Sequence, residues 1–376
     1  MSGGILSAVV PSDYGMMSSL VADSTVVKQR LDQLTQQAAS GLISDTYAGL
    51  GSGASISLNL RPQIANLQTW QNNVNAATGR MGVEQTALTQ IQSIAANFYA
   101  QLNTVQSSDA SEVDSVAASA RDALGSVASL LDEQDAGVYV FAGQDSSNPP
   151  VPAPDNILTS GFYTQINAAV SGLSANGAAA TANATFAVAT SNAAGTSPFS
   201  TYLSQSSATL QAALPTVQVG QGSSQPVGIP ASANGLIPDS VSTGQTIAGG
   251  PPSTTGSYMR DVLRALATIG SLSSSQANDP GFQDLVQDTR ISLSNAVSAL
   301  GQDAGVLGNV QSSLTSTQTQ LSDTQTALTT QVSPSENVDM ASTLSQLSLV
   351  QTQMQASYQL ISGMSGLSLV KFLPAG

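Results

Sequence analysis

Residues 293–332 read LSNAVSALGQDAGVLGNVQSSLTSTQTQLSDTQTALTTQV, and this stretch decides the fold. Apolar and small residues recur in it at steps of three and four, at Leu293, Ala296, Leu300, Ala304, Leu307, Val310, Leu314, Thr317, Leu321, Thr324, Leu328 and Val332. This heptad pattern is typical of a long helix that buries a narrow stripe against another helix. At 1.5 Å per residue the stretch Leu293–Leu328 would extend about 54 Å, so its partner must also be long.

The N-terminal third supplies partners with the same spacing. Heptad positions there predict three helices, over residues 20–38, 60–102 and 113–131. Gly41 is a natural stop for the first helix, and Pro62 is expected in the first turn of the second, where a missing N–H does little harm. We expect residues 1–17 to be irregular and residues 138–142 to form a short strand.

The C-terminal third adds a helix from Tyr258 and then the long heptad stretch. The sequence at Ser333, Pro334 and Glu336 predicts an N-cap, a proline in the first turn and the returning acid of a capping box. A last helix is therefore expected to begin there.

Residues 144–255 differ in character from both ends. Proline clusters bound a low-complexity segment rich in Ala, Gly, Asn and Thr, with predicted strands at 185–190 and 216–219 and a predicted helix at 199–214. The segment is a small β-rich or mixed insertion, or else disordered.

These elements predict a mainly α fold: an elongated bundle of long antiparallel coiled-coil helices from both termini, with the insertion in the middle. The predicted divisions are an N-terminal helix and loop (1–57), the two halves of the bundle (58–143 and 256–332), the insertion (144–255) and a C-terminal helix (333–376).

Composition excludes several classes of function. Nine basic against 23 acidic residues give a net charge of −14, which repels nucleic acid and anionic membranes alike. Histidine and cysteine are absent, so histidine-based catalysis, thiolate metal sites and disulfides are excluded. We expect no enzyme activity, no cofactor and no metal site.

The N-terminal sequence lacks the features of a secretory signal. No basic residue precedes Lys28, and no run approaches the 18 apolar residues of a membrane span. If the protein leaves the cytoplasm, we expect it to do so without a cleavable signal peptide.

The terminal helices carry apolar stripes for which the sequence suggests no further partner in the chain. Such stripes mark assembly surfaces, and contacts with the terminal helices of neighbouring copies would build an open helical polymer. The residues predicted for this interface are Leu20, Val27, Leu31, Leu34, Leu344, Leu347, Met354, Tyr358, Ile361, Leu367, Leu369, Phe372 and Leu373.

Both ends resemble the bacterial flagellin family, which comprises filament flagellin and the hook-associated junction protein. At the C-terminal end the resemblance lies in Glu336, Val338–Ala341, Gln351, Gln355–Tyr358, Leu367–Val370 and Phe372–Leu373. At the N-terminal end it lies in Ala39–Leu42, Leu58–Leu67, Asn73, Glu84–Leu88 and Ile91.

The resemblance implies a structural axial protein of the bacterial flagellum, located outside the cell and exported unfolded through the flagellar type III channel. Its implied partners are further copies of itself, the hook, junction, filament and cap proteins, and a flagellar export chaperone. The terminal helices would form the polymer core and the insertion would face outward.

Within the family, two parts of the chain favour different members. Residues 137–150, with Tyr139–Gly143 and Asn148–Pro150, are similar to the hook–filament junction protein, which we favour. Residues 355–358 are similar to the main filament flagellin of motile cells, the alternative. Alternatives of another class are a secreted adhesin or carbohydrate-binding module on a helical stalk, a tail-fibre or needle-tip component, and a soluble coiled-coil bundle.

Overall fold

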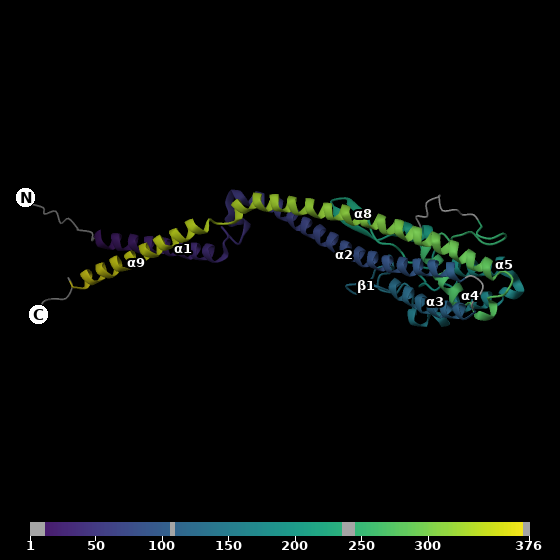
Figure 1. Ribbon diagram of the computed structural model, residues 1–376. Coiled ribbons are helices and arrows are strands. Elements are labelled where there is room, and N and C mark those ends of the chain that lie inside the picture. The colour runs from purple at the N-terminus through teal and green to yellow at the C-terminus, as the bar shows by residue number, and fades with distance from the viewer. Residues whose placement is uncertain (1–11, 106–109, 235–244, 371–376) are drawn as a thin grey trace, which may run out of the picture. The chain divides into compact units, whose positions relative to one another are not determined.

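The computed structural model describes residues 12–105, 110–234 and 245–370, and the fold is mainly α (Figure 1). The elements in chain order are α1 (Ser12–Ser40), the 3-10 helix η1 (Tyr47–Gly53), α2 (Ala54–Thr104), α3 (Ala110–Leu131), β1 (Gln134–Asp135), β2 (Val138–Tyr139), η2 (Pro154–Thr159), α4 (Gly161–Ser171), α5 (Leu173–Thr190), α6 (Ser207–Ala212), β3 (Thr216–Gly220), β4 (Ser223–Pro226), α7 (Tyr258–Gly270), η3 (Ser274–Gln276), α8 (Phe282–Glu336) and α9 (Met340–Val370). They form two compact units, unit 1 (residues 1–68 and 323–376) and unit 2 (residues 69–322). The five-segment division predicted from sequence stays a prediction.

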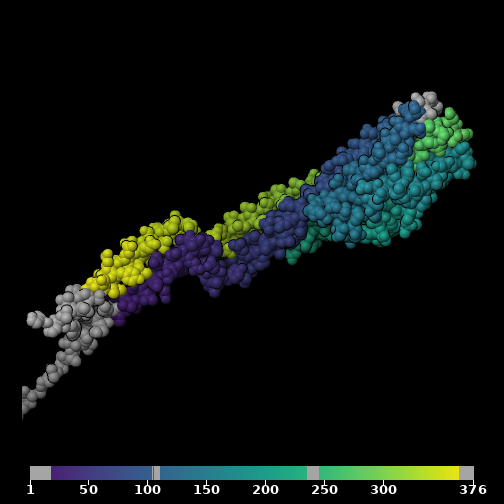
Figure 2. Space-filling view, turned by 90° about the horizontal axis from the view of Figure 1, so that it is seen from below, coloured from purple at the N-terminus to yellow at the C-terminus, as the bar shows by residue number. Residues whose placement is uncertain are grey.

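In unit 1 the two terminal helices α1 and α9 lie along each other, purple against yellow in Figure 2. An antiparallel bridge pairs Leu42 with Asn337 where α1 ends and α9 is about to begin. Further along the pair, Arg30 Nη2 donates to Gln346 Oε1 at 3.4 Å. The two helices therefore run antiparallel to each other.

In unit 2 the antiparallel pair is α2 and α8. Gln92 Nε2 of α2 donates to Val297 O of α8 at 3.3 Å, and Arg290 of α8 donates to Asn103 of α2. Heptad residues of both helices are buried, among them Val74, Met81, Leu88, Ile91 and Ala95 on α2 and Leu293, Ala296, Leu300, Leu307 and Leu314 on α8. The predicted heptad seam of α8 is confirmed except at Thr324, which is exposed.

Helices α3 and α7 complete the core of unit 2 by packing against each other. The chain enters α7 through Ser257, whose hydroxyl accepts from the Arg260 amide as an N-cap. Every residue of α7 is buried, so this helix is surrounded by other elements.

Several element boundaries differ from the predictions. Helix α1 already includes residues 12–17, which were expected to be irregular. Helix α2 begins at Ala54, so Pro62 lies inside it and not in its first turn. A proline there removes one helical hydrogen bond, which a helix of 51 residues tolerates because its neighbours hold it.

The insertion is mixed where it is described, with more helix than strand. The predicted strand at 185–190 is wrong, since α5 covers those residues, and the predicted helix at 199–214 is reduced to α6. The strand predicted at 216–219 is present as β3, paired antiparallel with β4 in a hairpin that matches Thr216 with Pro226. The strand predicted at 138–142 is shorter, because only Val138 and Tyr139 pair with β1.

The start of the last helix is also corrected. Helix α8 continues through Pro334 to Glu336, and α9 begins at Met340. Its N-cap is Asp339, whose Oδ1 accepts from the amides of Ala341 (2.9 Å) and Ser342 (3.2 Å). The capping box predicted at Ser333–Glu336 is therefore wrong.

Candidate assembly surface

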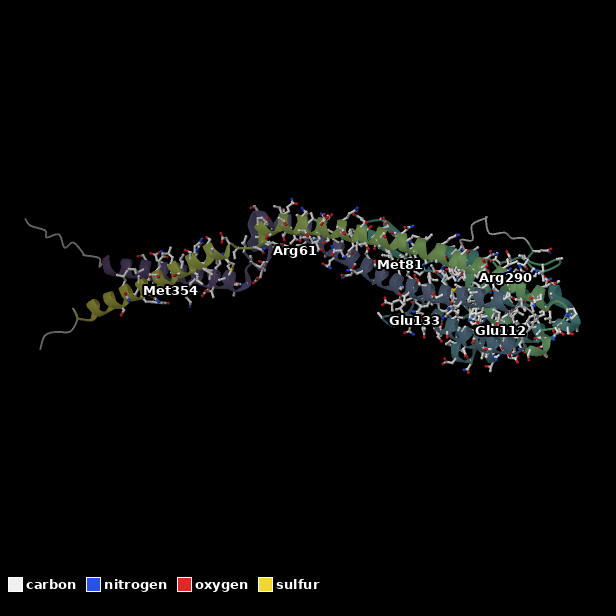
Figure 3. All side chains as sticks on the ribbon, viewed as in Figure 1. Arg61, Met81, Glu112, Glu133, Arg290 and Met354 are labelled. Atoms are coloured by element: carbon white, nitrogen blue, oxygen red, sulfur yellow. The ribbon has the colours of Figure 1, made fainter. Side chains whose placement is uncertain are left out.

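Packing of α1 against α9 buries one heptad seam from each helix. The prediction that these stripes lack a partner within the chain is wrong, because each is the partner of the other. Leu34 on α1 and Met354 on α9 (Figure 3) are 4% and 7% exposed. The other predicted interface residues of this seam, Leu20, Val27, Leu31, Leu347 and Ile361, are half-buried.

Large apolar side chains remain exposed on both sides of this seam. At 100° per residue, Leu344 and Tyr358 of α9 fall on one flank, while Leu349 and Leu360 fall on the other. Helix α1 repeats this arrangement with Val21 and Val26 on opposite flanks. The six side chains are between 50% and 63% exposed. We call them the flank residues.

Only Leu344 and Tyr358 among the flank residues were predicted from the sequence. The other four, Val21, Val26, Leu349 and Leu360, lie off the heptad positions and were missed. A signal was present, because apolar residues occur on every side of α9 and not on one stripe. A helix of that kind is normally surrounded by other elements.

For the remaining four predicted interface residues, the structure describes no side chain. The backbone at Leu367 and Leu369 is helical within α9, but the positions of their side chains are outside the described part of the structure. Phe372 and Leu373 lie outside the described residues.

A polar cluster fastens the α8–α9 connection to the loop between α1 and α2. The Glu336 carboxylate accepts from Arg61 (Figure 3), with Nε at 3.0 and 3.1 Å from its two oxygens and Nη2 closer, and from the hydroxyl of Ser57. Backbone hydrogen bonds run beside it, from Ile43 N to Glu336 O at 2.7 Å and from Val338 N to Gly41 O at 3.0 Å. We call this set the Glu336 cluster.

The environment of Glu336 favours its charged form. The hydrogen bonds from Arg61 lower the pKa of Glu336, the Ser57 hydroxyl adds to the effect, and burial opposes it. Gly53 packs directly on the end of α8, where a Cβ would come within 3.0 Å of Ser335 Cβ. The loop therefore fits closely against α8, and a side chain at position 53 would separate them.

Two buried arginines on α7 tie the insertion to the core of unit 2. Arg264 Nη2 donates to Asp288 Oδ2 at 2.5 Å, and the two side chains are 3% and 0% exposed. Arg264 Nε also donates to Thr185 Oγ1 of α5 at 3.2 Å. Arg260 donates to Ala189 O at 2.8 Å and Asn192 Oδ1 at 2.7 Å. The insertion is thus bonded to the helical core by side chains as well as by its chain ends.

Within the described part of the chain, neither a metal-ligand cluster nor a membrane-spanning helix is found. No three Asp or Glu side chains within it gather as metal ligands would. None of the helices whose residues are described has the length and apolarity needed to cross a bilayer.

Comparisons with known families match both ends of the chain. The family model of the bacterial flagellin N-terminal helical region matches residues 12–146, and that of the bacterial flagellin C-terminal helical region matches residues 292–373. Together the two matches cover more than half of the sequence, in the order expected for one protein. A comparison with curated proteins gave no match.

Proposed function

The chain belongs to the bacterial flagellin family, and on this premise we propose that it is the hook–filament junction protein of a flagellum, polymerising through the α1–α9 pair. A flagellin is a structural protein of the flagellum outside the cell and not an enzyme. Its subunits assemble with one another into a polymer. The partners proposed beyond other copies are the hook, filament and cap proteins and an export chaperone.

The observation that supports polymerisation through this pair is the exposure of the flank residues. Two helices in water can cover only one seam each, and six large side chains on both flanks stay in contact with solvent. Each well-buried side chain of this size contributes about 1.5–3 kcal/mol, so covering both flanks would favour association strongly. Different neighbours on the two flanks make a heterologous contact, which extends into an open helical polymer.

The proposed interface therefore has two parts. The seam residues hold the pair together, and the flank residues contact neighbouring copies. Leu344 and Tyr358 belong to the second part, and the side chains beyond Gly363 that were predicted for the interface stay in the proposal.

The junction role is supported by residues 137–150, whose sequence is similar to the junction protein. The hairpin of β1 and β2 opens this segment, and Phe141 and Ala142 follow it into the core of unit 2. The alternative is the main filament flagellin, which the similarity of residues 355–358 favours.

The test is seeded growth on sheared flagellar filaments, observed by electron microscopy. We expect purified protein to add to the filament ends. The pairs Leu344→Ser/Tyr358→Ser and Leu349→Ser/Leu360→Ser should each abolish addition without changing the helical content of the monomer. Leu158→Ser, an exposed apolar residue of η2 in unit 2, is the matched control and should add normally.

The outcomes separate the alternatives. Addition that stops after a short layer supports the junction protein, whereas filaments that keep growing support filament flagellin. Failure of the unaltered protein to add to the ends of the sheared filaments would refute the proposed polymerisation and leave the adhesin alternative.

A further inference from the structure

An irregular segment of unit 2, Val227–Ala231, crosses the core beside α2. We call it the strap. Its ends are held by backbone hydrogen bonds, from Val227 N to Pro215 O and from Ala231 N to Phe141 O, both at 2.9 Å. Between them the backbone is neither helix nor strand, and Gly228 has a φ of +87°. The strap also forms one wall of an apolar groove of about 440 Å³, lined on its other sides by Met81 (Figure 3), Leu307 and Val310.

Glu84 of α2 lies directly beneath the strap. Its side chain is 0% exposed, and neither carboxyl oxygen accepts a hydrogen bond of normal geometry, although the Ile229 amide of the strap lies close enough to favour the charged form. The contact is close, since a Cβ on Gly228 would lie 3.1 Å from Glu84 Oε1. A buried carboxylate without partners is unstable, whereas the neutral acid is tolerated. Burial accordingly raises the pKa of Glu84 to about 8, although the nearby Ile229 amide and Arg80 oppose the shift.

The ionisable groups around Glu84 do not offset its burial. On its own helix, Arg80 has a buried Nε without a hydrogen-bond partner and forms no ion pair with Glu84 within 4 Å among the described residues. Tyr258 of α7 faces Glu84 and lies against Asp303 of α8, and burial raises the pKa values of both. The strap itself contains no ionisable side chain. Glu84 is therefore the acid on which the strap rests.

We propose that Glu84 is a proton-controlled latch, which holds the strap closed when the carboxyl group is neutral and favours a lifted strap when it is ionised. An ionised carboxylate needs water, and the strap is the covering element that can admit it most easily. Helices α2, α7 and α8 are held by continuous backbone hydrogen bonds, whereas the strap is fastened at its ends, and such segments open at lower free energy. Lifting the strap removes one wall of the apolar groove and exposes its floor.

The direction of the pH dependence follows from linkage. When the strap is open, Glu84 meets water and ionises near the ordinary glutamate value; when it is closed, ionisation requires a pH of about 8. At a pH between the ordinary glutamate pKa and about 8, opening of the strap releases one proton from Glu84. The open fraction therefore rises about tenfold for each pH unit in this range. Above about pH 8 both states are ionised and the rise stops.

The experiment is amide hydrogen exchange of the peptide that contains the strap, in the full-length protein and in Glu84→Gln, measured at matched pH from about 5.5 to 9. The strap sequence is the same in both, so the ratio of exchange rates cancels the intrinsic chemistry. We expect this ratio to rise about a hundredfold from pH 5.5 to 7.5 and to level off above pH 8. Glu133→Gln, which alters an exposed carboxylate of the same unit, should exchange as the unaltered protein does.

Two further variants make the result decisive. Asp303→Asn tests the other nearby acid, and the pH dependence should survive it. Glu84→Met, of similar shape and without charge, replaces Glu84→Gln if the latter does not fold. A ratio that stays constant with pH, or a pH dependence that disappears in Asp303→Asn, would overturn the proposal. It does not depend on polymerisation, because exchange is measured on the monomer.

Discussion

Removal of Asp288 is the sharpest test of how unit 2 is held together. Asp288→Ala leaves the guanidinium of Arg264 buried without its charge partner, and its Nη1 already has no hydrogen bond. The hydroxyl of Thr246, which donates to Asp288 Oδ1, loses its acceptor as well. Breaking a buried ion pair on one side costs about 3–5 kcal/mol. For a unit of this size the melting temperature should fall by about 6–20 °C.

The assay is urea unfolding followed by the fluorescence of Trp70, the single tryptophan of the chain, which lies on α2 within unit 2. Asp284→Ala is the matched control, since it removes the same charge from an exposed position on α8 and should change the free energy of unfolding by no more than about 0.5 kcal/mol. The double change Arg264→Met/Asp288→Leu should recover most of the loss, because it removes both members of this buried ion pair together. A loss below about 1 kcal/mol in Asp288→Ala would refute the reasoning.

Two predictions concern unit 1. Leu34→Ala opens a cavity in the α1–α9 seam and should destabilise the pair by about 2 kcal/mol, measured as lost helicity and faster amide exchange in α1. The control Val26→Ala, on the exposed flank, should change the stability of the pair by no more than about 0.5 kcal/mol. Equal effects of the two substitutions would contradict the assignment of seam and flank. Glu336→Gln should weaken its cluster by about 1 kcal/mol at pH 7, a small value because Arg61 is half exposed. The pKa of Glu336 is lowered in the fold, so its contribution is present above the ordinary glutamate value and is lost as the pH falls through the lowered one. The exchange rate of the Ile43 amide should therefore be higher in Glu336→Gln than in the unaltered protein at pH 7, and the two rates should become equal in acid. A difference that grows in acid would exclude a stabilising role for the charged Glu336 carboxylate.

The long helices could be predicted from the sequence because their signal is local and repeated. In α8 the heptad residues Leu293, Leu300 and Leu307 recur every seven positions, and the same spacing on α2 identified the partner. Each repeat adds the same information, so one irregular position changes little. The ends of the helices carry no such redundancy, which is why Pro62 and the start of α1 were misplaced.

The Glu336 cluster could not be predicted, because its partners are far apart in the sequence. Serine, proline and glutamate at 333–336 match the local pattern of a helix start. The structure uses Glu336 to bind Arg61, 275 positions away, and leaves capping to Asp339. The energy that decides between the two arrangements comes from a tertiary contact, and a local pattern contains no information about it.

The insertion was mispredicted for a related reason. Residues 185–190 read TFAVAT, and their β-branched and aromatic side chains favour a strand in isolation. In the fold they lie on α5, where Thr185 contacts Arg264 and Phe186 lies 5.5 Å from the same guanidinium. Packing against α7 outweighs a strand preference of less than about 1 kcal/mol.

The contrast between α8 and α9 links the fold to assembly. Helix α8 places most of its large apolar residues on one buried seam beside α2, and among the described residues Val306, which is 46% exposed, is its one exposed large apolar side chain. Helix α9 also has a seam, which α1 covers. In addition it carries Leu344 and Leu349 on opposite flanks, where α1 does not cover them. A helix with apolar residues only at its seam positions would form a stable pair. A helix with apolar residues only on its flanks would need a neighbouring subunit to cover them. Having both, α9 can hold α1 in a single subunit and still gain free energy from each neighbouring copy, so seam substitutions should destabilise the α1–α9 pair and flank substitutions should only prevent growth.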